Sequence, residues 1–479
     1  MRYAYDVASV RAAEQELMAR LPDGTLMRRA ATGLARVTAA ILGEARGGVY
    51  GARVLLLVGV GDNGGDALYA GEALARRGAA VHAVLADPDR AHAAGLAALR
   101  AAGGRMAGPG DARALAGRAD LIMDGLLGIG GRGGLRGVFA ELAETAHAAV
   151  ADTGAPIVAV DLPSGVDADT GEVAGLAIRA DVTVTFGTVK PGLLLDPAAG
   201  HAGIVELVDI GLEFPTAAPV IEVLQEADVR ALLPEPGRAA NKYGRGVVGL
   251  AVGSTRYPGA GLLATGAALR SGVGAVRYDG PVEVAAVHPE VLLGDGRVQA
   301  WVVGSGLGRD EEARRRLERV LESDVPVLID ADGLRLLPKG PLGRSAPTLL
   351  TPHSGEAGAL LGSSADEVDS GRIQAVRELA RDYGAAVLLK GPLSLIADPL
   401  TPILRVNTHA SADLATAGSG DVLAGLAGGL LAGGLSPMDA ASVAAYLHGA
   451  AGLLAARSGP VAAGDLVAAL PAAWQNVAG

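Results

Sequence analysis

Near-continuous apolar runs recur along the whole chain and constrain its fold more than any other feature. In the first half they occupy 53–61, 80–86, 120–128, 156–165, 181–187 and 203–211, and in the second half 246–254, 274–280, 300–308, 325–334, 348–356 and 385–399. A strand without polar alternation is buried on both faces, as in a parallel sheet covered by helices. We therefore predict an α/β protein with two mostly parallel, doubly wound sheets, and a helical part from Gly418 to about Ala456.

The two series of runs indicate two domains. With 479 residues the chain is too long for one ordinary core. The segment GLEFPTAAP at 211–219 carries two prolines and interrupts the pattern between the series. We predict a first domain over 1–212, a linker over 213–222 and a second domain over 223–479.

Charge and composition exclude several classes of protein. A net charge of −11 argues against nucleic-acid binding, which needs a basic surface. The absence of cysteine excludes disulfides, thiolate metal sites and thiol nucleophiles. The charged N-terminus is unlike a signal peptide, and the longest uncharged runs are too short to span a membrane. We expect a soluble, cytoplasmic protein without membrane partners.

A glycine-rich turn follows the first strand of the first half. The sequence GVGDNGGD at 59–66 lets the backbone approach a phosphate, and the following helix offers free amides. The alternative is a tight turn in which Asp66 only caps the helix. Two more strands end in carboxylates, Asp124 before a glycine loop at 128–134 and Asp161 before Pro163, Ser164 and Gly165. An unpaired buried carboxylate is costly, so three such turns on one sheet edge favour a site.

These turns resemble the epimerase domain of the NAD(P)H-hydrate repair enzymes, which has a Rossmann-like fold. The shared motifs are Asn63-Gly64-Gly65-Asp66, Asp124 with its glycine loop, and Asp161-x-Pro163-Ser164-Gly165. The resemblance implies a potassium ion held by Asn63, Asp124 and Ser164, and Asp161 as the acid/base residue at the hydrated nicotinamide. It also implies that the hydrate is bound by Asp62, Asn63, Gly64, Gly65, Asp66, Gly128, Ile129, Gly130, Gly131, Arg132, Gly133, Gly134 and Asp161.

Three positions depart from the family pattern. Asp62 replaces an asparagine, Ala67 replaces a glycine, and Arg28 stands where a glutamate is usual. Asp62 adds negative charge beside the expected phosphate site. A degenerate first domain that only binds its ligand is therefore the alternative to an active epimerase.

The second half contains a similar turn at Gly418-Ser419-Gly420-Asp421. Its amides predict a concave anion site at the start of a helix. Phosphoryl transfer needs such a site, together with a carboxylate that accepts the proton of the attacking hydroxyl. By itself the segment is equally compatible with Asp421 as a helix cap.

Further motifs stand at the expected strand ends of the second half, in a fixed order. They are Asn241–Gly244, Tyr257–Gly261, Gly304–Gly308, Asp330–Gly333, Thr351–Glu356 and Lys390–Pro392. This ordered set resembles the ribokinase-like, ADP-dependent dehydratase of the same repair system. The resemblance implies Asp421 as the catalytic base and Ala260, Gly306, His353 and Asp421 around the hydrate. It implies that the adenine nucleotide, with magnesium, is bound by Lys390, Gly391, Pro392, Leu393, Ser394 and Gly420.

Some details of the second site stay open. His353 is either a pocket residue or a structural turn histidine, and Glu356 either assists magnesium or caps the next helix. Tyr243 separates Lys242 from Gly244, Ala417 replaces a glycine, and Ser411 stands where asparagine is common. These changes lie at the rim of the expected site.

The chain is therefore interpreted as a bifunctional enzyme that epimerises R and S hydrates of NAD(P)H and dehydrates the S form with ADP or ATP. The alternative is a ribokinase-like small-molecule kinase with a nucleotide-sensing first half. A third hypothesis makes the first domain a non-catalytic binding module for protein or nucleotide partners. We expect a homo-oligomer, as is frequent in families of this kind.

Overall fold

The computed structural model describes residues 1–238 and 240–479, which form two compact units. Tyr3–Val220 make up the N-terminal unit, and Ile221–Gly479 make up the C-terminal unit together with Met1 and Arg2. The amino group of Met1 lies 2.7 Å from Asp228 Oδ2. The first strand of the C-terminal unit after Val220, β9 (Ile221–Val223), begins inside the segment predicted as a linker.

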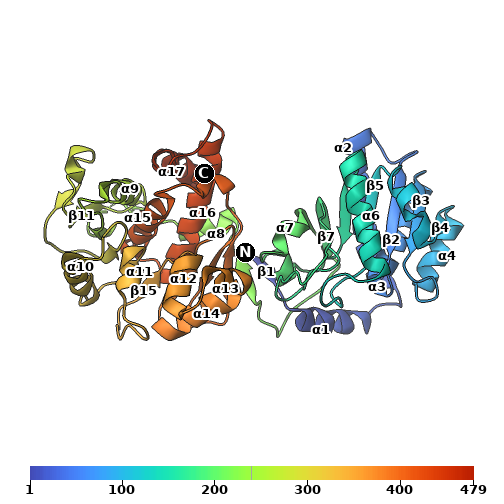
Figure 1. Ribbon diagram of the computed structural model, residues 1–479, viewed down its shortest axis with the longest axis horizontal. Helices are drawn as coiled ribbons and strands as arrows, with labels where there is room; N and C mark the ends of the chain where they lie inside the picture. Colours follow the sequence, from blue (N-terminus) through green and yellow to red (C-terminus); the bar gives the residue numbers. More distant parts are fainter. Residues whose placement is uncertain (239) are drawn as a thin grey trace. The chain divides into compact units, whose positions relative to one another are not determined.

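The N-terminal unit is built on a parallel sheet with the strand order β4-β3-β2-β5-β6-β7-β8 (Figure 1). The strands are β2 (Arg53–Val58), β3 (Ala80–Leu85), β4 (Arg105–Ala107), β5 (Leu121–Gly125), β6 (Ile157–Val160), β7 (Val182–Phe186) and β8 (Ile204–Val208). Each of the six predicted runs contains one of these strands. The sequence analysis missed β4, which has three residues and no buried position.

Helices cover both faces of this sheet, as the apolar runs predict. One core joins Val54, Leu56 and Val58 to α2 (Thr25–Arg46), α3 (Asp62–Arg76) and α4 (Ala93–Ala101). The other core joins Leu55 and Leu57 to α5 (Ala112–Ala116) and α6 (Val138–Thr153). Helix α1 (Val7–Met18) precedes these layers, and α7 (Ala199–Ala202) leads into β8.

The strand order of the N-terminal sheet reverses at β2, whose neighbours are β3 and β5. The chain after β2 therefore runs to one side of the sheet and the chain after β5 to the other. Ligands of open α/β sheets bind at such a switch point, beyond the carboxyl ends of the strands. The turn after β2 and the carboxylate of Asp124 in β5 both lie there.

The C-terminal unit contains a mixed sheet with the order β9-β18-β17-β16-β15-β14-β13-β10-β11-β12. Pairing is antiparallel only at β16–β17 and β17–β18 among the described strand pairs of this unit. The strands after β9 are β10 (Val247–Ala251), β11 (Ala275–Tyr278), β12 (Leu292–Leu293), β13 (Ala300–Val303), β14 (Val327–Ile329), β15 (Thr348–Leu350), β16 (Ala386–Leu389), β17 (Ser394–Ala397) and β18 (Leu404–Asn407).

Two layers of helices enclose this sheet (Figure 1). One layer contains α9 (Pro258–Ala268), α15 (Ser419–Ala432), α16 (Pro437–Ala456) and α17 (Ala463–Ala478), with α8 (Glu226–Leu232) beside it. The other contains α10 (Glu311–Leu321), α11 (Asp332–Leu336), α12 (Ser354–Leu361), α13 (Ala365–Ser370) and α14 (Arg372–Tyr383).

Two details differ from the predicted pattern. The run at 385–399 is not one strand but an antiparallel pair, because Gly391 and Pro392 turn the chain between β16 and β17. The predicted helical part after Gly418 is two helices, with the break between Ala432 and Pro437. Within the part of the chain that the structure describes, no helix combines the length and the apolarity needed to span a bilayer.

Helix α15 packs unusually close to its neighbours through glycines. A Cβ atom added at Gly425 would lie 2.1 Å from the carbonyl oxygen of Ala264 in α9. One added at Gly429 would lie 1.8 Å from Ser271 Oγ. Both distances are shorter than any real contact, so this helix fits its place only with glycine at these positions.

Candidate active sites

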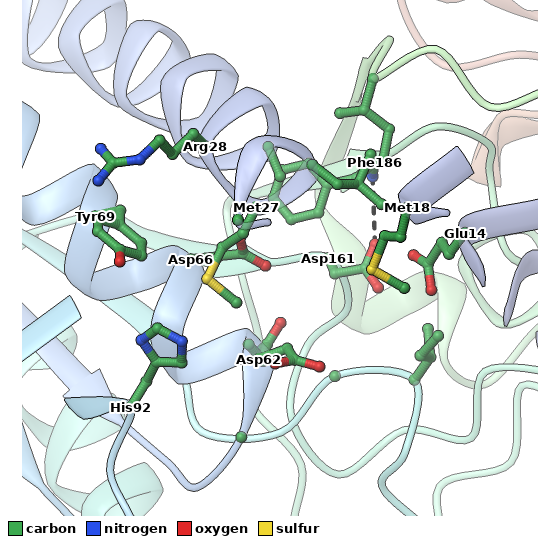
Figure 2. A pocket seen from close by; sticks show the side chains of 18 of the residues that line it. Glu14, Met18, Met27, Arg28, Asp62, Asp66, Tyr69, His92, Asp161 and Phe186 are labelled. Carbon is green, nitrogen blue, oxygen red and sulfur yellow. Dashed lines mark hydrogen bonds between the residues drawn. The ribbon is translucent and has the colours of Figure 1, made fainter. Parts of the chain in front are cut away.

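A cavity of about 940 Å³ opens at the carboxyl ends of the N-terminal strands (Figure 2). Its walls come from α1, from residues 21–30 at the start of α2, and from the turns after β2 and β5. Asp161 after β6 and Phe186 at the end of β7 complete it. This volume is of the size that a nucleotide-sized ligand requires.

Asp161 is held in this cavity by a buried lysine. The Lys190 ammonium lies 2.5 Å from Asp161 Oδ1 and also donates to Thr185 Oγ1 and the Phe186 carbonyl. Thr185 Oγ1 donates to the same Asp161 oxygen at 3.0 Å. Asp161 has a φ of 64°, a left-handed conformation that favours glycine. Such backbone strain persists where the surroundings fix it, and here they aim a carboxylate into the cavity.

Two further carboxylates, Asp66 and Glu14, line the same cavity as Asp161 (Figure 2). Burial raises the pKa of Asp66 well above its ordinary value, and the charges of Asp161 and Asp62 raise it further. Burial also raises the pKa of Glu14 on α1. Asp66 Oδ1 is buried without a hydrogen-bond partner among the described residues. The site therefore places two carboxyl groups with raised pKa values near one carboxylate that is paired with a cation.

The predicted potassium ligands border the same turn. Ser164 donates from its hydroxyl to Asp124 Oδ1 at 2.6 Å and from its amide to Asp124 Oδ2 at 2.8 Å. A Cβ atom added at Gly128 would lie 2.9 Å from Asn63 Oδ1, so the Asn63 amide lies against this loop. Burial raises the pKa of Asp124 to about 6, while its hydrogen bonds from Ser164 and Leu126 lower it.

The structure brings most of the predicted hydrate-binding residues of this unit to the cavity. Asp62, Asn63, Asp66, Gly128, Ile129, Gly130, Gly131 and Asp161 line it. Gly64, Gly65, Arg132, Gly133 and Gly134 are not among the described residues that do so. A Cβ at Gly64 would lie 2.5 Å from the Gly59 carbonyl, and one at Gly134 would lie 2.7 Å from Gly175 Cα. These two glycines serve close backbone packing.

In the C-terminal unit, Asp421 lies in the first turn of α15. The N-cap of this helix is Gly418, with a φ of 90°. Gly418, and not Asp421, therefore occupies the N-cap position of this helix. The first helical amides, including those of Gly420 and Asp421, lack acceptors within the helix and are available to an anion.

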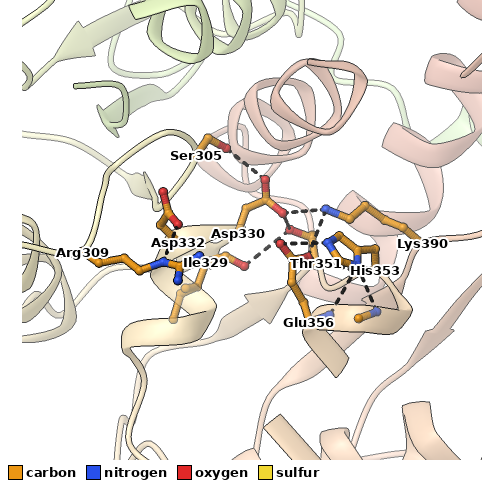
Figure 3. Close-up of polar contacts among 10 residues, drawn as sticks. Ser305, Arg309, Ile329, Asp330, Asp332, Thr351, His353, Glu356 and Lys390 are labelled. Atoms are coloured by element: carbon orange, nitrogen blue, oxygen red, sulfur yellow. Dashed lines mark hydrogen bonds and ion pairs between the residues drawn. The ribbon is translucent and has the colours of Figure 1, made fainter. Parts of the chain in front are cut away.

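A network of charged groups is centred on Asp330 and Lys390 (Figure 3). The charges of both groups act on the neighbouring Asp421. The Lys390 ammonium is 2.8 Å from Asp330 Oδ1 and 3.8 Å from Glu356 Oε2. Ser305 and Thr351 donate to the two oxygens of Asp330. A Cβ atom added at Gly420 would lie 3.4 Å from Lys390 Nζ, so the ammonium reaches the start of α15.

These surroundings tune the two central groups. Burial, together with the charge of Asp330, raises the pKa of Asp421 to about 6. Ser305 and Lys390 act in the opposite direction and limit this rise. Burial disfavours the charged form of Lys390, but Asp330 and Glu356 outweigh it and raise the pKa of Lys390 above its ordinary value. The site thus presents a permanent cation next to a carboxylate that takes up a proton near neutral pH.

The other predicted hydrate-binding residues of this site lie in two groups. Ala260 and Gly306 touch, since a Cβ at Gly306 would lie 2.6 Å from Ala260 Cβ. His353 is the N-cap of α12, where Nδ1 accepts from the Gly355 and Glu356 amides. Glu356 accepts from the His353 amide at 3.0 Å, so both residues belong to a capping box.

Hydrogen bonds from Arg372 hold the predicted nucleotide loop after β16 in place. Arg372 donates to the carbonyls of Lys390 and Leu393, and a Cβ at Gly391 would lie 2.4 Å from its guanidinium. Gly391 therefore makes room for Arg372. The loop continues through Pro392 to Ser394, the first residue of β17.

Several residues that build the two sites were not assigned a role from the sequence. Lys190 gave one signal, a lone lysine within an otherwise apolar segment. Asp330 ended a predicted strand, but nothing in the sequence paired it with Lys390. His448 on α16 lies 3.1 Å from the Ser419 carbonyl, and burial lowers its pKa to about 4, so it supports α15 as a neutral group.

Comparison with known proteins follows this division into two units. One family model, described as YjeF-related protein N-terminus, matches residues 23–192, and another, described as NAD(P)H-hydrate dehydratase, matches residues 248–471. The chain is 48% identical over 471 residues to the bifunctional NAD(P)H-hydrate repair enzyme Nnr of Mycobacterium leprae, covering 96% of both chains. It is 47% identical over 452 residues to the Mycobacterium tuberculosis enzyme of the same name, covering 92% of both.

One solved structure resembles part of this chain. It is the ADP/ATP-dependent NAD(P)H-hydrate dehydratase of Bacillus subtilis, co-crystallised with ATP and Mg²⁺. The match has 31% sequence identity and a TM-score of 0.49, and it covers 53% of this chain and 97% of that one.

Proposed function

Because this chain belongs to the family of bifunctional NAD(P)H-hydrate repair enzymes, we propose that its two units catalyse successive repair steps. The N-terminal unit interconverts the R and S forms of the hydrate. The C-terminal unit dehydrates the S form at the expense of ADP or ATP. One pairing in each unit supports this most directly: Asp161 with Lys190, and Asp421 with Lys390 at the start of α15.

In the N-terminal unit, epimerisation needs a group that gives a proton to the departing hydroxyl oxygen of the hydrate and takes one from the returning water. Asp161 is placed for this, because it faces the cavity and its charge is balanced by Lys190. As an acid it would assist departure of the hydroxyl, and as a base it would accept a proton from the returning water. Asp66 and Glu14, whose pKa values burial raises, would contact the polar substrate.

In the C-terminal unit, Asp421 would accept the proton of the hydrate hydroxyl as its oxygen attacks the terminal phosphorus of the nucleotide. The amides at the start of α15 and the Lys390 ammonium would balance the charge on the transferred phosphoryl group. Phosphate then leaves with the bonding electrons, and loss of a ring proton restores the dihydronicotinamide. The raised pKa of Asp421, about 6, suits a base that works near neutral pH.

A potassium ion fits the turn around Asp124. The groups that contact this buried carboxylate are neutral, namely Ser164 and the Leu126 amide, and its pKa is raised to about 6. A cation held by oxygens of Asn63, Asp124 and Ser164 would offset that buried charge. It would supply electrostatic support to the loop at 128–131 and to a bound phosphate.

Magnesium would enter the C-terminal site with the nucleotide. Among residues 1–238 and 240–479, no group of three or more His, Cys, Asp or Glu side chains is arranged to hold a metal ion. Asp330 and Glu356 are already engaged by Lys390. Magnesium commonly binds through substrate phosphates and water, with one or two carboxylates, which suits this arrangement.

One assay tests both activities. The purified protein is incubated with a mixture of R and S hydrates of NADH, with ADP and magnesium, and the recovery of NADH absorbance is followed. Complete recovery supports both steps, and recovery that stops at the S fraction contradicts the epimerase. No recovery with either ADP or ATP contradicts the dehydratase. We also propose that the protein is a cytoplasmic homo-oligomer. Light scattering would measure the mass of this oligomer in solution.

A further inference from the structure

An arginine stacked on a tyrosine forms one end of the N-terminal cavity (Figure 2). The guanidinium carbon of Arg28, at the start of α2, lies 4.8 Å from the centre of the Tyr69 ring. The other neighbour of that ring is His92, edge-on at 5.7 Å between centres. All three side chains line the cavity, and they come from three separate segments of the fold.

This arginine has no anionic partner. Over the described residues, no hydrogen bond or ion pair involves the Arg28 guanidinium. Its side chain is exposed, whereas Tyr69 and His92 are partly buried beneath it. A guanidinium positioned over an aromatic ring keeps its planar set of N–H groups available for two oxygens of a phosphate.

The neighbouring histidine adds a donor to the same end. His92 Nδ1 accepts a hydrogen bond from the Gly95 amide at 3.0 Å, where it caps α4. In the neutral imidazole, the proton therefore resides on Nε2. Arg28 and His92 thus offer donors at a place where no carboxylate is bound to them.

The catalytic pair lies at the other end of the cavity. Figure 2 shows Arg28, Tyr69 and His92 on one side and Asp161 with Glu14 on the other, with Asp62 and Asp66 between them. The second arginine of the lining, Arg11, lowers the pKa of Glu14 by its charge and so belongs to the Asp161 end. Among the described residues that line the cavity, Arg28 is therefore the arginine at the end opposite Asp161.

The positions of Asp161 and Arg28 at opposite ends suggest one orientation for a dinucleotide hydrate in this cavity. With its hydrated nicotinamide at Asp161 and its pyrophosphate at the start of α3, its adenosine reaches Arg28. The phosphorylated and unphosphorylated forms of this substrate differ only by a phosphate on the 2′-oxygen of that adenosine. An arginine beside the ribose is the usual way in which a dinucleotide site accommodates this phosphate.

We propose that Arg28, supported by Tyr69 and His92, binds the 2′-phosphate and gives the epimerase a preference for the NADPH hydrate. The proposal rests on the proposed function for the identity of the substrate. The binding part stands independently, because it concerns any ligand with an adenosine 2′-phosphate. It assigns the specificity of this unit to one side chain.

Calorimetric titration of the full-length protein with NADP⁺ and NAD⁺ tests the binding directly. Arg28→Ala removes charge-assisted hydrogen bonds and should weaken NADP⁺ binding by roughly ten- to a hundredfold, with NAD⁺ changed by less than about threefold. Arg28→Glu should weaken NADP⁺ further. Arg36→Ala, an exposed position two turns along α2, is the matched control and should change neither affinity.

Two results would overturn the proposal. One is an equal loss of NAD⁺ and NADP⁺ affinity in Arg28→Ala, which assigns Arg28 to the adenine or to the fold. The other is no loss of either. All three substitutions lie in the N-terminal unit. The heat of nucleotide binding to the C-terminal unit is therefore the same for every variant and does not affect their comparison.

Epimerase kinetics then separate this proposal from the function itself. For wild type, kcat/KM with the R form of NADPH hydrate should exceed that with the NADH hydrate, and Arg28→Ala should abolish the difference through KM. If wild type epimerises neither hydrate but Arg28→Ala still loses NADP⁺ binding selectively, the proposed epimerase fails and the phosphate site stands. If both hydrates are epimerised with equal kcat/KM by wild type, the specificity proposal fails alone.

Discussion

The Lys190 ammonium lies 2.5 Å from Asp161 Oδ1 at the N-terminal cavity, and 1% of the lysine side chain is exposed. A buried ammonium this close balances the charge of the carboxylate and fixes its direction. The pair is therefore as much a part of the epimerase site as Asp161 itself. It also couples the activity of this unit to its stability.

Replacing Lys190 by methionine should stop epimerisation. The loss should be roughly a hundredfold or more, the range that acid/base groups contribute. Leaving Asp161 buried without its partner should also cost about 3–5 kcal/mol in the free energy of unfolding. Recovery of NADH from mixed hydrates should then stop at the S fraction, as for Asp161→Ala.

The same molecule contains the control for this experiment. Dehydration of pure S hydrate should proceed at the wild-type rate in Lys190→Met, and Lys339→Met, an exposed lysine, should alter neither step. The double variant Lys190→Met/Asp161→Asn should be more stable than either single variant by urea unfolding, because no unpaired charge remains. Full recovery at the normal rate in Lys190→Met would show that Asp161 acts without its partner.

Replacing Asp421 by asparagine should abolish dehydration while the fold is retained. The amide is nearly isosteric but cannot accept the hydroxyl proton, so the rate should fall by roughly 10²–10⁴-fold. Thermal unfolding should change little, because Gly418 is the N-cap of α15. Asp413→Asn, an exposed aspartate shortly before this helix, is the matched control. A loss of stability with normal activity would assign Asp421 to the helix instead.

The pH dependence of dehydration should report the same carboxylate. Burial raises the pKa of Asp421 to about 6, and the base acts only when deprotonated. The value of kcat/KM should therefore be level at neutral pH and fall about tenfold per pH unit below about pH 6. A rate profile with S hydrate at saturating ADP would measure this limb. An acid limb centred near the ordinary aspartate value would contradict the assignment.

Potassium should stabilise the N-terminal unit in a pH-dependent manner. Burial raises the folded-state pKa of Asp124 to about 6, so without a cation its contribution to stability is lost as pH rises from the ordinary carboxyl range through about 6. Potassium binds the deprotonated carboxylate and should restore that loss. The increase in the unfolding temperature on adding potassium should thus be larger at pH 7.5 than at pH 5.

Equal ionic strength with choline is the control for this measurement, and Asp124→Asn should remove the pH-dependent part of the potassium effect. Epimerisation should slow when potassium is withdrawn, while dehydration of pure S hydrate stays unchanged. An equal increment at both pH values would show that potassium acts elsewhere.

Replacing Lys390 by methionine should weaken nucleotide binding in the C-terminal unit. The ammonium lies at the start of α15, where a phosphate would contact Gly420, so the KM for ADP should rise by roughly tenfold or more. Asp330, 3% exposed, loses its partner at the same time and should destabilise the unit. Adding Asp330→Asn should recover stability but not the KM, which separates binding from folding.

Much of this architecture follows from short-range patterns. Runs such as 53–58 and 386–389 are apolar at every buried position, so their strands and the parallel sheets were predictable. The positions of Asp161 and Asp421 were also predictable, because each follows a strand or precedes a helix within a recognisable motif, and their catalytic roles stay predictions. The partners Lys190 and Asp330 were not, since they come from other strand ends and depend on how the sheets align. The split of 385–399 depends on Gly391, whose missing side chain admits Arg372.

Close packing of α15 has a consequence for how this enzyme changes over time. Ala264 and Ser271 would clash with any side chain at Gly425 or Gly429, so the helix that positions Asp421 cannot drift by gradual exchange of residues along that face. A substitution at Gly425 or Gly429 would need a matching change in the segment 264–271, so the helix that carries Asp421, the proposed base, and this segment should change together.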